Sequence, residues 1–146
     1  MVNVRLAESE KDRETCLSLR WTVFVEEQGV PPSMEVDERD RSDAVHALAT
    51  WNGVPAGTGR FILEAKGAAA RIGRMAVVDD VRGRGIGRAL LAFLEERAKA
   101  RGAAKLVLWS QVSARPFYEK AGYRVVSEKP FDDAGIPHVA MEKQAG

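Results

Sequence analysis

The chain has 146 residues, enough for one domain with a sizeable core, and its 45% hydrophobic and 29% charged residues are typical of a soluble globular protein. Its 22 lysines and arginines nearly balance 21 acidic residues, so a net charge of +1 creates no global field that recruits nucleic acid or an anionic membrane. Cys16 is the single cysteine, which excludes an intrachain disulfide and a cysteine-based zinc cluster and fits a cytoplasmic protein.

The first half of the chain predicts a helix between strands. Ser9 precedes a charged turn with Asp12 three residues later, which is typical of a helix start. The helix is expected to end near Gly29, because Pro31 cannot continue it. Asn52-Gly53 is the strongest short hairpin signal. The expected ranges are a strand at 3–7, the helix from 9 to about 29, a polar loop at 28–43, and strands at 44–51 and 54–64.

The second half predicts a longer amphipathic helix that starts at Gly85 and stops at Gly102. Further back, Gly57 and Gly59 lie inside an expected strand and indicate a bulge or a close approach of another element. The remaining ranges are strands at 71–78, 105–110, 123–128 and 138–142 and a short helix at 113–121. The order β-α-β-β-β-α-β-α-β-β predicts an α+β fold with a mixed sheet.

Arginine and glycine alternate in the loop that opens the long helix, at Arg82, Gly83, Arg84, Gly85, Ile86, Gly87 and Arg88. Amides at a helix start have no intrahelical acceptor, and glycine removes the Cβ atoms that would block a diphosphate. The loop therefore fits a phosphate-bearing ligand, and a basic surface turn is the alternative. A Walker loop and a dinucleotide fingerprint fit worse, because the Lys-Ser/Thr pair and the third glycine are missing.

Two motifs carry a resemblance to a known family. The run RGRGIG at 82–87 matches the [QR]-x-x-G-x-[GA] signature of the GCN5-related N-acetyltransferases (GNAT), and the residues at 114–123 resemble the family's A-x-x-[FL]-Y-E-K-x-G-[FY] segment. The stretch at 23–40 looks like the ElaA-type branch. The resemblance implies one GNAT domain over 1–146, with a mixed, mostly antiparallel central sheet flanked by helices.

The resemblance also implies acetyl-CoA as co-substrate, with no metal. In this family the loop amides bind the pyrophosphate of acetyl-CoA, and the strand before the loop, here Met75, Ala76 and Val77, contacts the pantetheine arm through its backbone. Gln111 stands where the family often has Asn, and it is expected to keep that hydrogen-bonding role. Tyr118 corresponds to the tyrosine assigned as general acid; packing of its ring is the alternative. Its neighbour Phe117 is expected in the core.

The general base is not fixed by the family motifs. His138 begins the last expected strand and resembles the histidine of glyphosate-type N-acetyltransferases that is taken as base, although a packed or surface histidine is an equal alternative. His46 is expected to pack within a strand. The acidic stretch at 26–43 is either an acceptor mouth, in which Glu27, Glu35 and Asp37 relay a proton, or a loop held by salt bridges.

The expected function is therefore transfer of acetyl from acetyl-CoA to the amine of a small molecule, by a monomer or homodimer that binds neither nucleic acid nor membrane. Arg20, Glu27 and Arg74 are the candidate acceptor-binding residues, and Arg20 is alternatively a solvated or paired charge. Cys16 is expected as a core residue rather than a nucleophile. A catalytically silent sensor or scaffold that binds acetyl-CoA is the alternative function.

Overall fold

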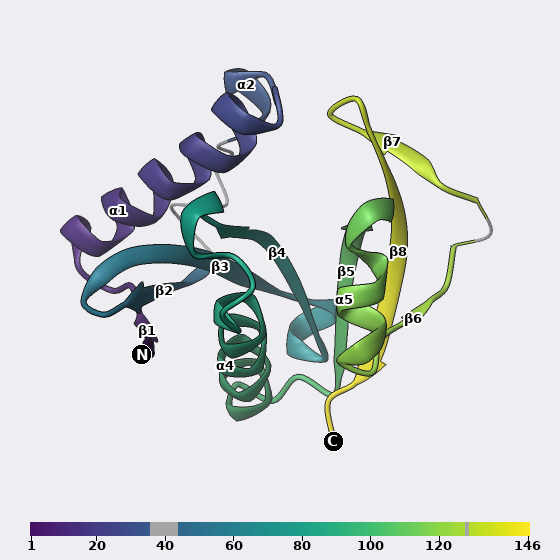
Figure 1. Cartoon of the computed structure of the whole chain (residues 1–146). Coiled ribbons are helices and arrows are strands. Elements are labelled where there is room, and N and C mark those ends of the chain that lie inside the picture. The colour runs from purple at the N-terminus through teal and green to yellow at the C-terminus, as the bar shows by residue number, and fades with distance from the viewer. Residues whose placement is uncertain (36–43, 128) are drawn as a thin grey trace.

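One mixed sheet organises the protein, whose computed structural model describes residues 1–35, 44–127 and 129–146 (Figure 1). The strand order is β1-β2-β3-β4-β5-β8-β6, with β7 paired to β8, and within the described residues β4 and β5 form the one parallel pair. The strands are β1 (Val2–Leu6), β2 (Val45–Trp51), β3 (Val54–Glu64), β4 (Ala69–Val77), β5 (Lys105–Gln111), β6 (Arg124–Val125), β7 (Phe131–Asp133) and β8 (Ile136–Gln144).

The helices begin and end at the residues that sequence chemistry favours. Ser9 caps α1 (Glu10–Arg20), because its Oγ accepts the N–H of Asp12 at 3.0 Å. The chain continues as a π-helical segment (Trp21–Glu27), and Gly29 follows it with a φ of 74°. The other helices are α2 (Pro32–Glu35), α4 (Ile86–Ala100) and α5 (Arg115–Lys120). In the described part of the chain, no helix is long and apolar enough to cross a membrane.

Both faces of the sheet are covered (Figure 1). Successive residues of β2 point to opposite faces, so Ala47 and Ala49 join the main core under α4, whereas Leu48 packs with Cys16 and Leu19 of α1. Two glycines of β3 let α4 approach closely: a Cβ on Gly57 would lie 3.0 Å from Leu90 Cδ1, and one on Gly59 would lie 2.8 Å from Leu94 Cδ1. The expected close approach at these glycines is confirmed.

The centre of the sheet opens where β4 and β5 separate. The two strands pair from Ala69 with Lys105 to Ile72 with Leu108, and their pairing ends there. Arg74 has a φ of 50°, and the register between β3 and β4 shifts opposite it, so β4 bulges at this point. The second half of β4 therefore leaves its edge toward β5 unpaired, which creates a gap between the two halves of the sheet.

The expected element order is confirmed, and two short elements were missed. The single turn α2 lies within the range expected as loop, where Pro32 stands at its first position, and β7 pairs with β8 across Ala134 and Gly135, which have φ of 55° and 81°. The strand expected at 123–128 is only β6, since Arg124 and Val125 pair with β8. Residues 36–43 of the acidic stretch, including Asp37, and Glu128 lie outside the described residues.

Candidate active site

The loop before α4 presents a row of free backbone amides. Gly83 and Gly85 have φ of 82° and 80°, a conformation that favours glycine, and a Cβ built on either would meet nothing within 4 Å. The first hydrogen bond of the helix runs from Ala89 N–H to Gly85 O, at 3.0 Å. Among the described residues, the amides at 83–88 have no backbone acceptor. The turn is therefore built as an open anion site at a helix start.

The three arginines of this loop have different surroundings. Arg82 forms a bidentate ion pair with Glu27, both contacts at 2.6 Å, and its Nε donates to Val77 O at 2.9 Å. The hydrogen bonds of this pair raise the pKa of Arg82 and lower the pKa of Glu27. Arg84 lies over the ring of Trp51, 5.2 Å from its centroid, and Arg88 is exposed. Arg82 and Glu27, expected on the cofactor and acceptor sides, are thus joined to each other.

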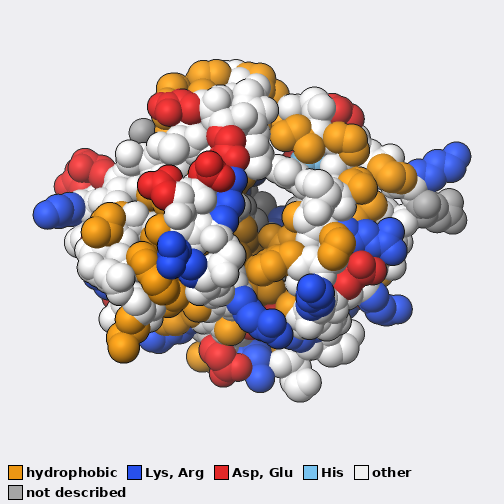
Figure 2. All heavy atoms as spheres, viewed as in Figure 1, with side chains coloured by type: hydrophobic (Ala, Val, Ile, Leu, Met, Phe, Trp, Pro, Cys, Tyr) orange, Lys and Arg blue, Asp and Glu red, His pale blue; other side chains and the backbone are white. Residues whose placement is uncertain are grey.

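A cavity of about 610 Å³ lies where the sheet opens, between α2 and the hairpin of β7 and β8. In Figure 2 the molecule is hollowed between its two halves at this place. The lining includes most of the expected catalytic groups and several residues that the sequence did not single out. Met75, Gln111, Tyr118 and His138 were expected in the site, whereas Trp109 and Asp133 were not.

Tyr118 reaches this cavity from α5. Its side chain is buried, with the rings of Phe117 and Tyr123 packed edge-on at centroid distances of 5.0 and 6.0 Å. Burial raises the pKa of Tyr118 to about 12, so the phenol keeps its proton at neutral pH. The expectation that Phe117 belongs to the core is wrong: it is 37% exposed, because α5 holds it against Gly87 at the start of α4.

His138 faces the cavity from β8 in a fixed orientation. Its Nδ1 lies 2.7 Å from the carbonyl oxygen of Ile136, and a carbonyl only accepts, so Nδ1 carries a hydrogen. Phe131 stacks on the imidazole at a centroid distance of 6.2 Å, and Nε2 lies 3.9 Å from Oδ2 of Asp133. In its neutral form the ring therefore presents the lone pair of Nε2, the atom that a general base needs.

Arg20 and Arg74 both hold the α2 turn. Arg20 is 1% exposed; its Nε donates to Glu35 Oε1 at 2.5 Å and its Nη2 donates to Glu35 O at 2.7 Å. Arg74 donates from Nε to the same carbonyl at 3.0 Å. Arg74 and Glu35 line the cavity, whereas Arg20 lies behind Glu35. Of the two readings of Arg20, the structure places it as a paired charge.

The expected cofactor contacts on β4 and β5 lie at the gap between these strands. Met75 lines the cavity, Ala76 is buried, and the side chain of Val77 would lie 3.8 Å from a Cβ on Gly87. Gln111 lines the cavity and donates from Nε2 to Oε1 of Gln28 at 2.8 Å. This hydrogen bond ties the end of β5 to the residue after the π-helical segment.

Trp109 and Asp133 are among the cavity residues that were missed from the sequence. Trp109 belongs to an apolar run that predicts a buried strand, yet it is 52% exposed. Its ring packs edge-on against Phe131 at a centroid distance of 5.2 Å. Asp133 ends the short strand β7, which had no periodic signal. His46 and Cys16 are buried away from the cavity, as expected; burial raises the pKa of the Cys16 thiol, whose Sγ lies 3.6 Å from Ala47 O.

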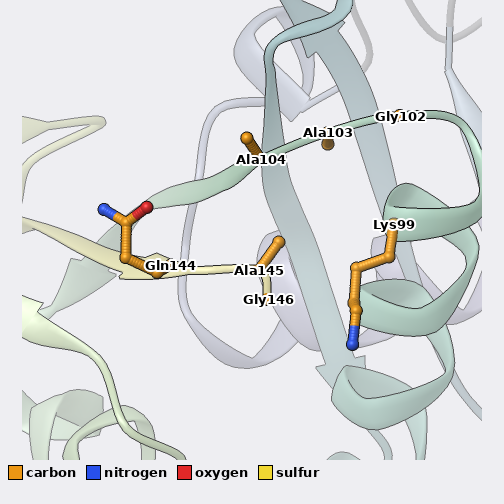
Figure 3. A pocket seen from close by; sticks show the side chains of 7 residues that line it. All are labelled: Lys99, Gly102, Ala103, Ala104, Gln144, Ala145 and Gly146. Carbon is orange, nitrogen blue, oxygen red and sulfur yellow. The ribbon is translucent and has the colours of Figure 1, made fainter.

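A second hollow, of about 440 Å³, lies at the opposite end of α4. Figure 3 shows its wall of alanine and glycine, with the side chains of Lys99 and Gln144 at opposite sides. Among the described residues that line it, Lys99 has the one charged side chain, which pairs with Glu96 at 3.6 Å, so this lining brings together no acidic and basic side chains. Among residues 1–35, 44–127 and 129–146, no three His, Cys, Asp or Glu side chains converge as a metal site.

Comparison with known proteins links this architecture to one family. The family model described as "Acetyltransferase (GNAT) domain" matches residues 8–145. A Bacillus subtilis protein that carries an acetyltransferase name is 41% identical over 145 residues, covering 98% of this chain and 97% of the relative. A second B. subtilis protein, the uncharacterized N-acetyltransferase YjcF, is 38% identical over 138 residues and covers 94% and 96% of the two chains.

Solved structures share the fold over almost the whole chain. A crystal structure from Lactobacillus plantarum, named for an N-acetyltransferase, superposes with a TM-score of 0.89 at 34% identity and covers 99% of this chain and 98% of its own. The crystal structure of Escherichia coli ElaA superposes with a TM-score of 0.85 at 25% identity and covers 98% and 99% of the two chains. The mixed sheet flanked by helices is thus that of these neighbours.

Proposed function

Because the chain belongs to the GNAT family of acetyltransferases, we propose that it transfers the acetyl group of acetyl-CoA to the amine of a small molecule by direct attack on the thioester. The acetyl thioester supplies an activated carbonyl carbon and a thiolate leaving group. Three tasks remain for the protein: it holds the diphosphate, it stabilises the oxyanion that develops on the carbonyl, and it moves two protons.

The free amides before α4 support the assignment of the diphosphate. They have no backbone acceptor among the described residues, the helix dipole adds about half a positive charge, and no side chain shields them at Gly83 and Gly85. Arg84 and Arg88 supply side-chain charge beside these amides. In this arrangement Arg82 acts mainly through Glu27, because their ion pair ties the π-helical segment to the loop.

The unpaired edge of β4 is the proposed site of the thioester. Beyond Ile72 this strand has no partner in β5, so backbone N–H groups of Met75–Val77 on that edge can donate to a ligand that enters the gap. A backbone donor aimed at a developing oxyanion is worth about 3 kcal/mol of barrier. The bulge at Arg74 turns this part of the strand relative to its neighbours.

Tyr118 and His138 divide the proton transfers. His138 accepts a proton from the amine through the Nε2 lone pair that its hydrogen bond to Ile136 leaves facing the cavity. Tyr118 donates its phenolic proton to the departing sulfur, and its raised pKa keeps that proton in place until a thiolate forms. Both side chains line one cavity beside the gap between β4 and β5, and this joint placement is the observation that carries the proposal.

Two measurements on the purified chain test the proposal. Calorimetry with CoA and acetyl-CoA measures binding, and release of free thiol with a panel of primary amines measures turnover. We expect saturable heat with both ligands and thiol release that depends on the amine. Binding heat without turnover on any amine would support a cofactor-binding sensor instead of an enzyme. The absence of binding heat with both ligands would contradict the diphosphate site.

A further inference from the structure

The hairpin of β7 and β8 places Asp133 beside His138, the proposed base. Phe131 pairs with His138 and Asp133 with Ile136, so the chain reverses directly after Asp133. Asp133 and His138 both line the cavity, and their side chains are 37% and 11% exposed. The neighbouring Asp132 has another task, since its Oδ2 accepts the N–H of Gly135 at 3.3 Å within the turn.

Asp133 and His138 face each other as two acceptors. In the neutral imidazole, the hydrogen on Nδ1 of His138 leaves Nε2 with a lone pair, and Oδ2 of Asp133 lies 3.9 Å from that atom. This distance is too long for a hydrogen bond, and two acceptors repel each other at closer range. A group with several N–H donors, placed between them, would satisfy both atoms.

The other charges of the cavity leave this carboxylate open. Arg71 is held by Glu64 in a bidentate pair at 2.8 and 3.2 Å, and Arg74 donates to the carbonyl of Glu35. Within the part of the chain that the structure describes, no lysine or arginine pairs with Asp133. The negative charge at the mouth of the hairpin is therefore available to a cation from solution.

We propose that Asp133 and Nε2 of His138 together bind the ammonium group of the acceptor, which enters the cavity as a cation. This proposal rests on the proposed function. An ammonium has three donors, so it bridges both acceptors and still points one hydrogen elsewhere. Asp133 is thus a substrate-binding residue for cationic primary amines. The stacked ring of Phe131 keeps the imidazole in the orientation that this bridge requires.

The proton and bond changes balance from this starting complex. One ammonium proton passes to Nε2 of His138 and leaves later to solvent. The amine nitrogen then bonds to the carbonyl carbon as the carbon–sulfur bond breaks. The sulfur takes the proton of Tyr118, and the second proton lost by the new amide nitrogen restores the phenol.

The chain has two histidines, which makes ammonium binding directly observable by NMR of the imidazole nitrogens. The full chain is titrated with butylammonium chloride, with butanol as a neutral probe and sodium chloride as a salt control. His46 is buried outside the cavity lining and serves as an internal reference. The variants are Asp133→Asn and, as a matched control on the same hairpin, Asp132→Asn.

We expect butylammonium, but not butanol, to shift Nε2 of His138 in a saturable way in the wild type and in Asp132→Asn. Loss of a charge-assisted hydrogen bond in Asp133→Asn weakens this binding about tenfold or more, and raises KM for an amine substrate with little change in kcat. No saturable shift in the wild type, or equal affinity in the two variants, overturns the ammonium site.

The two proposals fail separately. A shift that depends on Asp133, together with no thiol release on any amine, would keep the ammonium site and remove the acetyl transfer. Thiol release with an affinity that does not depend on Asp133 would keep the enzyme and remove the ammonium site.

Discussion

Replacement of Tyr118 by Phe tests the proposed general acid with little disturbance of the fold. The phenol oxygen has no hydrogen-bond partner among the described residues, so Tyr118→Phe leaves no buried donor or acceptor unpaired. We expect the free energy of unfolding at pH 7 to change by less than about 1 kcal/mol. Loss of an acid in the transition state lowers kcat about 100-fold or more, and the affinity for CoA stays the same.

The raised pKa of Tyr118 gives a second, independent signature in stability. The pKa of Tyr118 in the folded protein is about 12, above the ordinary value of 10.0. Its contribution to the free energy of unfolding is therefore fully present below pH 10 and is lost as the pH rises toward 12. At about 1.4 kcal/mol per pH unit, the wild type loses roughly 3 kcal/mol over this range through Tyr118. The pKa of Tyr123 is also raised, and the variant keeps that residue.

The measurement compares urea unfolding of the wild type and Tyr118→Phe between pH 7 and pH 12. We expect the variant to gain stability relative to the wild type only above pH 10, where Tyr118 begins to ionise in the unfolded chain. The main causes of the raised pKa of Tyr123, its burial and its hydrogen bond to Glu95, are common to both proteins. Thiol release by the wild type should show no loss of kcat from Tyr118 below pH 10. A variant with full kcat places the acid elsewhere, and parallel stability curves up to pH 12 contradict the buried phenol.

Three further changes probe the other parts of the site. Gly85→Asp adds a carboxylate to the open amides and should abolish CoA binding in calorimetry while circular dichroism stays native; unchanged affinity would contradict the diphosphate site. His138→Ala should lower kcat in thiol release about 100-fold or more, and an unchanged kcat would move the base to the acidic stretch or to water. Arg20→Met leaves Glu35 as a buried unpaired charge and should cost about 3–5 kcal/mol in urea unfolding, whereas a cost near zero would show that this pair is dispensable.

Much of the fold could be predicted because its signals are local. Ser9 caps α1 through an N–H three residues later, and Gly83 and Gly85 have the positive φ that their place before a helix requires. Short elements were missed because a local pattern needs several residues before it can be recognised. β7 spans only Phe131–Asp133, too few residues for an alternating pattern to emerge, so Asp133 was not recognised as a cavity residue.

The charged residues of the site were harder to interpret, because their partners are distant in the sequence. Arg82 and Glu27 are 55 residues apart, and Arg74 reaches the backbone of Glu35 across 39 residues. The sequence indicated that these groups lie near the site, but it did not show that they bind one another. Arg20, for which the sequence left acceptor binding and a solvated or paired charge open, is covered and paired with Glu35.

The sequence by itself determined the order of helices and strands and the chemistry of the loop before α4, since caps, periodicity and glycine conformations act between neighbouring residues. Only the tertiary structure decided which charges pair and which remain open to a ligand. A charge removed from water needs a partner in space, whatever its distance along the chain, so Arg20 lies against Glu35. Asp133 lies at the cavity 3.9 Å from His138 Nε2, and no lysine or arginine of the described residues pairs with it.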